Sequence, residues 1–343
     1  MRRGWFAAAA MERVVEEAME TGRSRVRKRA GTIAALPLFF IGFSCGWLYA
    51  HTAHTRLFIH TTFLHTQGTE NAMAEAAAGL QDVRHIVAVA SGKGGVGKST
   101  TAVNLALALV AEGRSVGLLD ADIYGPSIAM LLGLPDGTQP KVLNGNTFVP
   151  VAAHNLKTMS MAYLASASTP MVWRGPMAGG ALIQMLTQTN WGELDVLVVD
   201  MPPGTGDIQL TLAQKARVSG AVIVTTPQDI ALLDARKGIE MFNKVRIPVL
   251  GVVENMSLHV CTQCGHAEPI FDTGGGAKVA AEYGTVLLGS LPLDRRIREG
   301  DAGRPIVAAD PDGELAGRYR EIARGVLTAL AGLDASVPEI VIE

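Results

Sequence analysis

The glycine-rich motif at residues 92–99 restricts the possible folds of this 343-residue chain more than any other feature. It reads Gly-Lys-Gly-Gly-Val-Gly-Lys-Ser and matches the phosphate-loop pattern G-x-x-x-x-G-K-[ST]. Residues 85–91, just before it, form a short apolar run typical of a buried parallel strand, and residues 100–112 predict a helix. This order of strand, glycine turn and helix directs loop N–H groups and a helix N-terminus toward phosphates. The motif therefore predicts a nucleotide-binding α/β fold.

The motif also assigns roles within the loop. Lys98 is expected to neutralise the β- and γ-phosphates of ATP, and the Ser99 hydroxyl to ligate Mg²⁺. The alternative is a glycine-rich turn without a ligand, which the complete pattern in this context disfavours. The residues predicted to contact the nucleotide are Gly92, Lys93, Gly94, Gly95, Val96, Gly97, Lys98, Ser99 and Thr100.

Alternating apolar runs and helical segments follow the motif. Residues 115–120, 194–200, 221–226 and 249–254 are continuous apolar runs, as expected of central strands covered on both faces. Helices are predicted over residues 180–188, 230–245, 276–283 and 313–333. With right-handed crossovers, this pattern predicts a doubly wound, mostly parallel sheet with its ligands at the carboxyl edge.

Two of these strands end in aspartate. Asp120 and Asp122 follow one strand and Asp200 follows another, so all three are expected beside the phosphate loop. Carboxylates there can hold Mg²⁺ through its waters or orient an attacking water. A strand-terminal aspartate can instead cap a helix. Gly204 and Gly206 leave the segment after Asp200 free to respond to the γ-phosphate.

A cysteine pair forms the second chemical signature. Cys261 and Cys264 have the C-x-x-C spacing that suits thiolates converging on a metal or cluster, a redox pair, or half a zinc site. A four-thiolate site needs two more cysteines, and the chain has only Cys45 besides. A homodimer would supply the pair twice, which meets the requirement for a shared [4Fe–4S] cluster. Zinc bound by the same four thiolates is the main alternative.

Residues 1–72 differ from the rest of the chain. A basic cluster at residues 23–29 precedes an uncharged stretch at residues 32–50 that is long enough to span a membrane. The positive-inside rule would then place the nucleotide-binding region outside the cell, so a membrane location is disfavoured. The remaining interpretations are an anchor, a targeting extension, or translated sequence upstream of a true start at Met73, and we favour the last. Residues 73–335 form the predicted ATPase domain and residues 336–343 a tail.

Charge and cysteine content narrow the partners and the compartment. The formal net charge of −2 gives no basic field for nucleic acid. Three cysteines do not make a disulfide framework, so a reducing compartment is expected. The cytoplasm is the first choice and the mitochondrial matrix the alternative.

The second lysine of the loop, Lys93, makes it similar to the deviant Walker A loop of the MinD/ParA/nitrogenase-reductase class of dimeric ATPases. The resemblance implies that Lys93 reaches across a homodimer to the partner's nucleotide, where an ammonium group stabilises transition-state charge. It further implies that Asp122 positions the attacking water, while Asp120 and Asp200 serve the Mg²⁺ shell.

Together with the cysteine pair, further motifs resemble the Mrp/ApbC (Mrp/NBP-type) family of iron–sulfur cluster carrier ATPases. These motifs lie at residues 120–127, 172–176, 200–207, 254–257, 271–276 and 292–299. The resemblance implies that Asn255 recognises adenine. It also implies an ATPase that receives clusters from assembly donors and delivers them to apoproteins. Residues 1–72 do not look like the small α+β domain that bacterial members often carry, whereas a mitochondrial relative lacks that domain.

Other functions fit the sequence less well. A membrane-linked tyrosine autokinase would end in a tyrosine-rich tail, and no tyrosine follows Tyr319. A MinD-like positioning ATPase would need a basic amphipathic helix near its C-terminus, whereas residues 313–333 mix both charges. A zinc-binding, nucleotide-gated scaffold remains the non-enzymatic alternative.

Overall fold

The structure is a computed structural model that describes residues 79–335, apart from 124, 145, 165–174, 205, 207–208, 211, 213–214 and 301. The expectations for residues 1–72, Cys45, the uncharged stretch 32–50 and the tail 336–343 lie outside the described residues. Parts of the motifs at 172–176 and 200–207 lie outside them as well.

An eight-stranded sheet forms the centre of the described region, with the order β12-β9-β8-β1-β7-β2-β6-β5. All neighbouring pairs are parallel except β5 and β6. The strands are β1 (Val83–Ala90), β2 (Val116–Asp120), β5 (Val151–Ala153), β6 (Leu156–Ser160), β7 (Leu194–Asp200), β8 (Gly220–Thr225), β9 (Val249–Glu254) and β12 (Leu287–Ser290).

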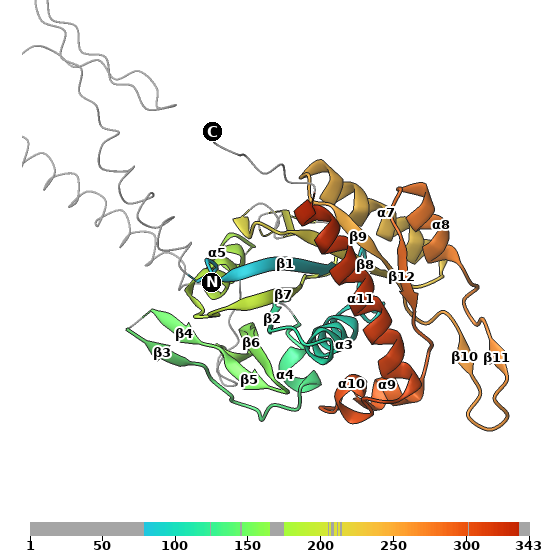
Figure 1. The fold of residues 1–343 in the computed structure, drawn as a ribbon, viewed down its shortest axis with the longest axis horizontal. Helices are drawn as coiled ribbons and strands as arrows, with labels where there is room; N and C mark the ends of the chain where they lie inside the picture. Colours follow the sequence, from blue (N-terminus) through green and yellow to red (C-terminus); the bar gives the residue numbers. More distant parts are fainter. Residues whose placement is uncertain are drawn as a thin grey trace, which may run out of the picture. The chain divides into compact units, whose positions relative to one another are not determined.

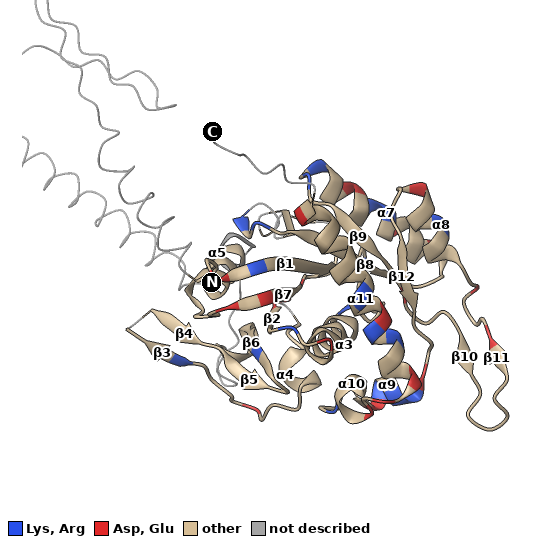
Figure 2. Cartoon of the chain, viewed as in Figure 1, with Lys and Arg blue, Asp and Glu red and all other residues tan. Residues whose placement is uncertain are grey.

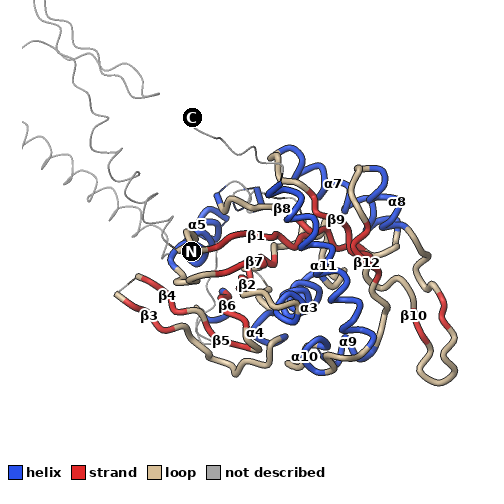
Figure 3. Tube along the Cα trace, in the orientation of Figure 1, coloured by secondary structure: helices blue, strands red, loops and turns tan. Residues whose placement is uncertain are grey.

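Helices cover both faces of this sheet (Figures 1 and 3). Alternate residues of β1 belong to different apolar clusters, because successive side chains of a strand point to opposite faces. Val87 and Val89 lie in the cluster that includes α3, α10 and α11, whereas Ile86 and Ala88 lie in the cluster that includes α5, α7 and α8. The helices are α3 (Lys98–Ala111), α4 (Ile128–Leu131), α5 (Gly175–Gln188), α7 (Asp229–Lys244), α8 (Gly275–Glu282), α9 (Arg295–Gly300), α10 (Ile306–Ala309) and α11 (Glu314–Ala335), with a 3₁₀ turn at Met161–Tyr163.

This architecture confirms the predicted doubly wound, mostly parallel α/β fold. The sequence patterns did not predict β5, β6, β12 or the short helices α4, α9 and α10. They also missed two small antiparallel pairs, β3 (Lys141–Leu143) with β4 (Thr147–Val149), and β10 (His259–Val260) with β11 (Ala267–Glu268). The first helix begins at Lys98 rather than at residue 100, so Lys98 and Ser99 lie in its first turn.

The carboxyl ends of the parallel strands place the predicted polar residues at one edge. Asp200 at the end of β7 is level with Val89 of β1 on one side and with Asp120 of β2 on the other. Backbone hydrogen bonds from Ala121 N to Asp200 O (2.9 Å) and from Met201 N to Val89 O (3.0 Å) extend this pairing beyond the strands.

None of the described helices is both long enough and apolar enough to span a membrane. The apolar side of α11, the last described helix, is buried against the core through Leu315, Tyr319, Ile322 and Val326.

Candidate functional site

The phosphate loop connects β1 to α3 and has a backbone that suits glycine. Gly95 and Gly97 have positive φ angles of 83° and 82°, a conformation that residues with a Cβ rarely adopt. A Cβ at Gly97 would lie 2.2 Å from Asn255 Nδ2, and one at Gly92 would lie 2.1 Å from the carbonyl oxygen of Asp234 in α7. Close packing against α7 and against Asn255, the residue after β9, therefore fixes the path of the loop.

Lys98 forms a buried ion pair at the bottom of this loop. Its Nζ lies 2.5 Å from Asp200 Oδ1 and donates to Ser99 Oγ at 3.1 Å. Burial raises the pKa of Asp200 above its ordinary value, although the adjacent Lys98 ammonium acts in the opposite direction. The other oxygen, Asp200 Oδ2, is buried and has no hydrogen-bond partner among the described residues. An unpartnered carboxylate oxygen beside a serine hydroxyl fits a Mg²⁺ shell, because that ion prefers oxygen ligands.

Asp120 is surrounded by hydrogen-bond donors. Its Oδ2 accepts from Ser160 Oγ (3.0 Å) and from the backbone N–H groups of Ser127 and Ile128 (3.1 and 3.2 Å). Its Oδ1 accepts from Asp122 N at 3.1 Å. Burial and the nearby charge of Asp200 raise the pKa of Asp120 to about 7. Asp120 thus orders the loop after β2. Its contacts with the N–H groups of Ser127 and Ile128, at the start of α4, correspond to the helix-capping role that the sequence offered as the alternative.

Asp122 lies on the loop that Asp120 holds in place. Its side chain is partly exposed at the carboxyl edge, and its Oδ1 accepts from Gly125 N at 3.2 Å. The fold therefore brings Asp120, Asp122 and Asp200 to the edge that carries Lys98 and Ser99, as the strand pattern predicted.

Asn255 directly follows β9 and contacts the phosphate loop. Its Nδ2 donates to Val96 O at 2.9 Å, its Oδ1 accepts from Met256 N at 3.0 Å, and its side chain is largely buried. The residue thus braces the loop. Adenine recognition by Asn255 stays a prediction.

Two buried residues of the site were missed by the sequence analysis. Gln209 donates through Nε2 to Pro202 O and Pro203 O at 3.1 and 2.9 Å, which orders the segment after Asp200. Glu254 accepts from Gly276 N at 2.5 Å and from Gly274 N at 3.3 Å at the start of α8. Their partners are backbone groups, so neither residue was assigned a role from the sequence, although Glu254 lies in the motif at residues 254–257.

Lys93 is a partly exposed residue of the phosphate loop, and its carbonyl oxygen accepts from Ser91 Oγ at 2.9 Å. Gly204 N donates to Ser91 O at 3.0 Å, so the same serine also joins this loop to the segment after Asp200.

The cysteine pair lies on the hairpin formed by β10 and β11, which extends away from the central sheet and its helices (Figure 1). Cys261 N donates to His266 O and Gly265 N donates to Cys261 O, both at 2.9 Å. Backbone N–H groups of Cys264 and Gln263 lower the pKa of the Cys261 thiol, which favours the thiolate needed for metal binding.

The hairpin offers an incomplete ligand set. Cys261 is half-buried, Cys264 is exposed, and neither is in a disulfide. Within the described part of the chain, no group of three or more His, Cys, Asp or Glu side chains could hold a metal ion. The expected ligands are thus present as one accessible pair.

Comparisons with known proteins identify the family and the relatives of this chain. The model of a ParA-type family, described as the NUBPL iron-transfer P-loop NTPase, matches residues 82–327. The chain is 64% identical over 246 residues to an iron–sulfur cluster carrier protein of Pseudomonas fragi, covering 71% of this chain and 86% of that protein. It is 50% identical over 254 residues to the mouse iron–sulfur cluster transfer protein NUBPL, covering 73% and 79% of the two chains.

Solved structures give the same fold. A nucleotide-binding protein of Archaeoglobus fulgidus in complex with ADP matches with a TM-score of 0.62 and 35% identity, covering 71% of this chain and 95% of that one. The cell-division ATPase MinD of Pyrococcus furiosus has a TM-score of 0.54 and 21% identity, covering 71% and 98%, and supports the fold alone. The chain belongs to the ParA-type family of NUBPL iron-transfer P-loop NTPases.

Proposed function

We propose that the protein is an iron–sulfur cluster carrier whose cargo is a [4Fe–4S] cluster held between two subunits, and that it hydrolyses ATP to control this cargo. The observation that carries the proposal is the accessible Cys261/Cys264 pair, one half-buried and one exposed, on a hairpin of a chain with a complete phosphate loop. Relatives in bacteria and in mouse are named as carriers or transfer proteins for such clusters. We expect delivery to apoproteins after loading by an assembly donor.

The roles proposed in ATP binding and hydrolysis belong to residues at the carboxyl edge of the sheet. The loop amides and Lys98 would bind the phosphates of ATP. Ser99, Asp120 and Asp200 would serve the Mg²⁺ shell, the carboxylates through its waters. Asp120 would also fix the loop that presents Asp122 to the attacking water. Lys93 would act across the dimer. The magnesium ion would supply charge neutralisation at the phosphates.

The proposal of a cluster shared between two subunits rests on the number of thiolate ligands. Two thiolates per subunit are half of what a [4Fe–4S] cluster requires, and a symmetric dimer brings identical surfaces together. We place the protein in a reducing compartment, the cytoplasm or the mitochondrial matrix, because exposed thiols persist there. For residues 1–72 we keep the proposal of sequence upstream of a start at Met73.

Anaerobic reconstitution of the full-length chain with iron and sulfide tests the proposal. We expect four iron and four sulfide ions per two chains, bound to a dimer. Cys261→Ala and Cys264→Ala should each abolish binding. His266→Ala in the same turn and Cys45→Ala should retain it, because the missing thiolates come from the second subunit. One zinc ion per dimer, bound regardless of iron supply, would show that the cluster assignment is wrong.

Hydrolysis is tested separately with purified protein and ATP. Activity should require Mg²⁺ and should be lost in Lys98→Ala. A chain that binds the cluster but shows no hydrolysis above the Lys98→Ala background would be a nucleotide-gated scaffold, and the ATPase part of the proposal would be refuted.

A further inference from the structure

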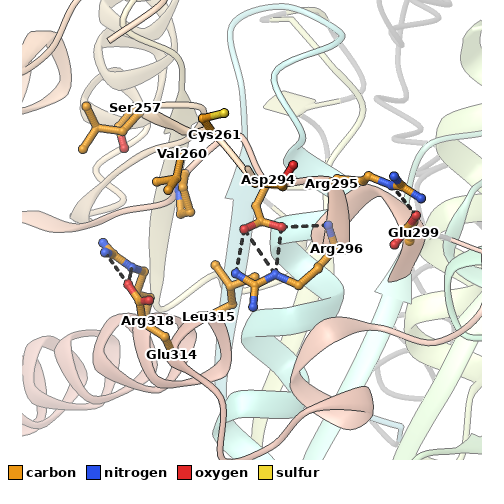
Figure 4. Close-up of a pocket in the computed structure, with 13 residues that line it drawn as sticks. Ser257, Val260, Cys261, Asp294, Arg295, Arg296, Glu299, Glu314, Leu315 and Arg318 are labelled. Atoms are coloured by element: carbon orange, nitrogen blue, oxygen red, sulfur yellow. Dashed lines mark hydrogen bonds and ion pairs between the residues drawn. The ribbon is translucent and has the colours of Figure 1, made fainter. Parts of the chain in front are cut away.

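A cavity adjoins the cysteine hairpin and is separate from the nucleotide site. Its volume is about 510 Å³, and Cys261 forms part of its wall (Figure 4). Three parts of the chain line it: the start of the hairpin at residues 257–262, the loop and first turn of α9 at residues 292–299, and the first turn of α11 at residues 314–318.

Hydrogen bonds to backbone carbonyl groups fix the wall that contains Cys261 to the opposite wall. Ser257 N and Ser257 Oγ both donate to Leu291 O at 3.0 Å, and Leu293 N donates to Leu258 O at 2.7 Å. The start of the hairpin, just before Cys261, therefore has a defined position relative to the segment that leads into α9.

Three arginine–carboxylate pairs form part of the lining. Arg296 donates to both oxygens of Asp294, with its Nη2 2.7 Å from Oδ2. Arg318 Nη2 lies 2.9 Å from Glu314 Oε1, and Arg295 Nε lies 2.6 Å from Glu299 Oε1. Figure 2 shows both charge signs along α9 and the start of α11.

These charges select the kind of ligand. The lining has three arginines, one aspartate and two glutamates, so its formal charges cancel. A phosphorylated ligand would need uncompensated cations, whereas each guanidinium here already has a carboxylate partner. Arginine has five N–H donors, so Arg295 and Arg296 retain donors beyond these pairs. With Val260, Pro292 and Leu315 forming apolar walls, the cavity suits a polypeptide segment with mixed charge.

Cluster transfer requires an acceptor thiol next to a donor thiolate. In such an exchange the incoming thiol loses its proton and forms an Fe–S bond, while the Fe–S bond to Cys261 breaks and that thiolate takes up a proton. The oxidation state of iron does not change. A segment bound in the cavity would hold its cysteine beside Cys261 and make this exchange effectively intramolecular.

We propose that this cavity, the Cys261 pocket, is the docking site for the cysteine-bearing segment of the acceptor apoprotein. The inference rests on the proposed carrier function and adds the place where the acceptor binds. Cys261, rather than the exposed Cys264, is then the first ligand to be replaced.

Cluster transfer from the full-length dimer to apo-aconitase, measured by recovered aconitase activity, tests this proposal. Val260→Trp fills the pocket, and Val286→Trp is its control. Val286 is an exposed valine just before the amino end of β12, whereas the pocket lies beyond the carboxyl end of that strand. Arg295→Glu reverses a charge of the lining. Arg298→Glu makes the same change on α9 outside the lining. We expect the second-order transfer rate to fall at least about tenfold for Val260→Trp and Arg295→Glu and to stay within about twofold for both controls.

Other readouts separate docking from simpler causes. Cluster content, dimer formation, ATP hydrolysis and cluster loss to a small iron chelator should be unchanged in Val260→Trp. Normal transfer in both pocket variants would overturn the proposal. Loss of the dimer in Val260→Trp would show that the pocket belongs to the subunit interface. If cluster loss to the chelator slowed as much as transfer to aconitase, the pocket would only be a route by which small molecules reach the cluster. Either result would also overturn the docking proposal. Failure of the unsubstituted protein to bind or transfer a cluster would instead refute the proposed function itself.

Discussion

At the scale of single residues, the Lys98–Asp200 ion pair joins stability to nucleotide chemistry. Both side chains are almost completely buried, with exposed fractions of 7% and 0%. Taking two charges out of water has a large cost that their attraction offsets only when both are present. The pair therefore keeps a cation at the phosphate site before any phosphate has bound.

Substitutions of this pair should separate stability from activity. We expect Lys98→Met to lower the free energy of unfolding by about 3 kcal/mol, because it leaves Asp200 buried without its cation. The double variant Lys98→Met/Asp200→Asn should recover most of that loss in urea denaturation, yet hydrolyse no ATP.

A surface pair provides the control. Lys237→Met removes the exposed ion pair with Asp234 and should change the free energy of unfolding by less than about 0.5 kcal/mol. If the double variant is no more stable than Lys98→Met, the instability has another origin than the unpaired carboxylate.

At the scale of elements, continuous apolar strands were predictable and polar ones were not. The runs ending in Asp120 and Asp200 were recognised because nearly all residues of these two strands are buried, so each strand is a continuous apolar run in the sequence. The strand β6 was missed because Thr158 and Ser160 interrupt its apolar pattern. They are nevertheless buried, since Thr158 Oγ1 donates to Val151 O at 2.8 Å and Ser160 Oγ donates to Asp120. Such satisfaction of polar groups exists only once the fold has formed.

The candidate site shows the same division. Lys98, Ser99 and the cysteine pair could be singled out from the sequence because each belongs to a short motif whose residue types and spacing indicate a particular chemistry. Asp120 as the organiser of its loop, Gln209 and Glu254 could not, because their partners are backbone N–H and C=O groups brought together by the tertiary structure. The Cys261 pocket needed three distant segments to be placed together.

The contact between the phosphate loop and α7 leads to a prediction at this scale. A Cβ at Gly92 would lie 2.1 Å from Asp234 O, which is helix backbone and cannot rotate away. We expect Gly92→Ala to displace the loop and weaken ATP binding at least about tenfold, as measured by calorimetry. Gly238→Ala in α7 is the control, because nothing lies within 4 Å of its added Cβ. It should retain binding and raise the free energy of unfolding by about 0.5–1 kcal/mol. Unchanged ATP affinity in Gly92→Ala would show that the loop does not depend on this contact.

At the scale of the whole molecule, the proposed function assigns both chemical signatures of the chain to a dimer. The hairpin offers two thiols where the proposed [4Fe–4S] cluster would need four, and Lys93 is a partly exposed residue of its own phosphate loop. A symmetric dimer would supply the missing thiols and the second lysine together, which would make hydrolysis and cargo binding properties of the same assembly.

Mixed dimers test whether Lys93 acts on the partner's nucleotide. Lys93→Ala and Lys98→Ala should each be inactive alone. In a mixed dimer, the site of the Lys93→Ala chain keeps its own Lys98 and receives Lys93 from the Lys98→Ala chain, so one of the two sites is complete. Random exchange of equal amounts makes half of the dimers mixed, and ATP hydrolysis should recover to about one quarter of the unsubstituted rate. If Lys93 served its own site, no mixed dimer would contain a complete site and the mixture would stay inactive, since every site would lack one of the two lysines.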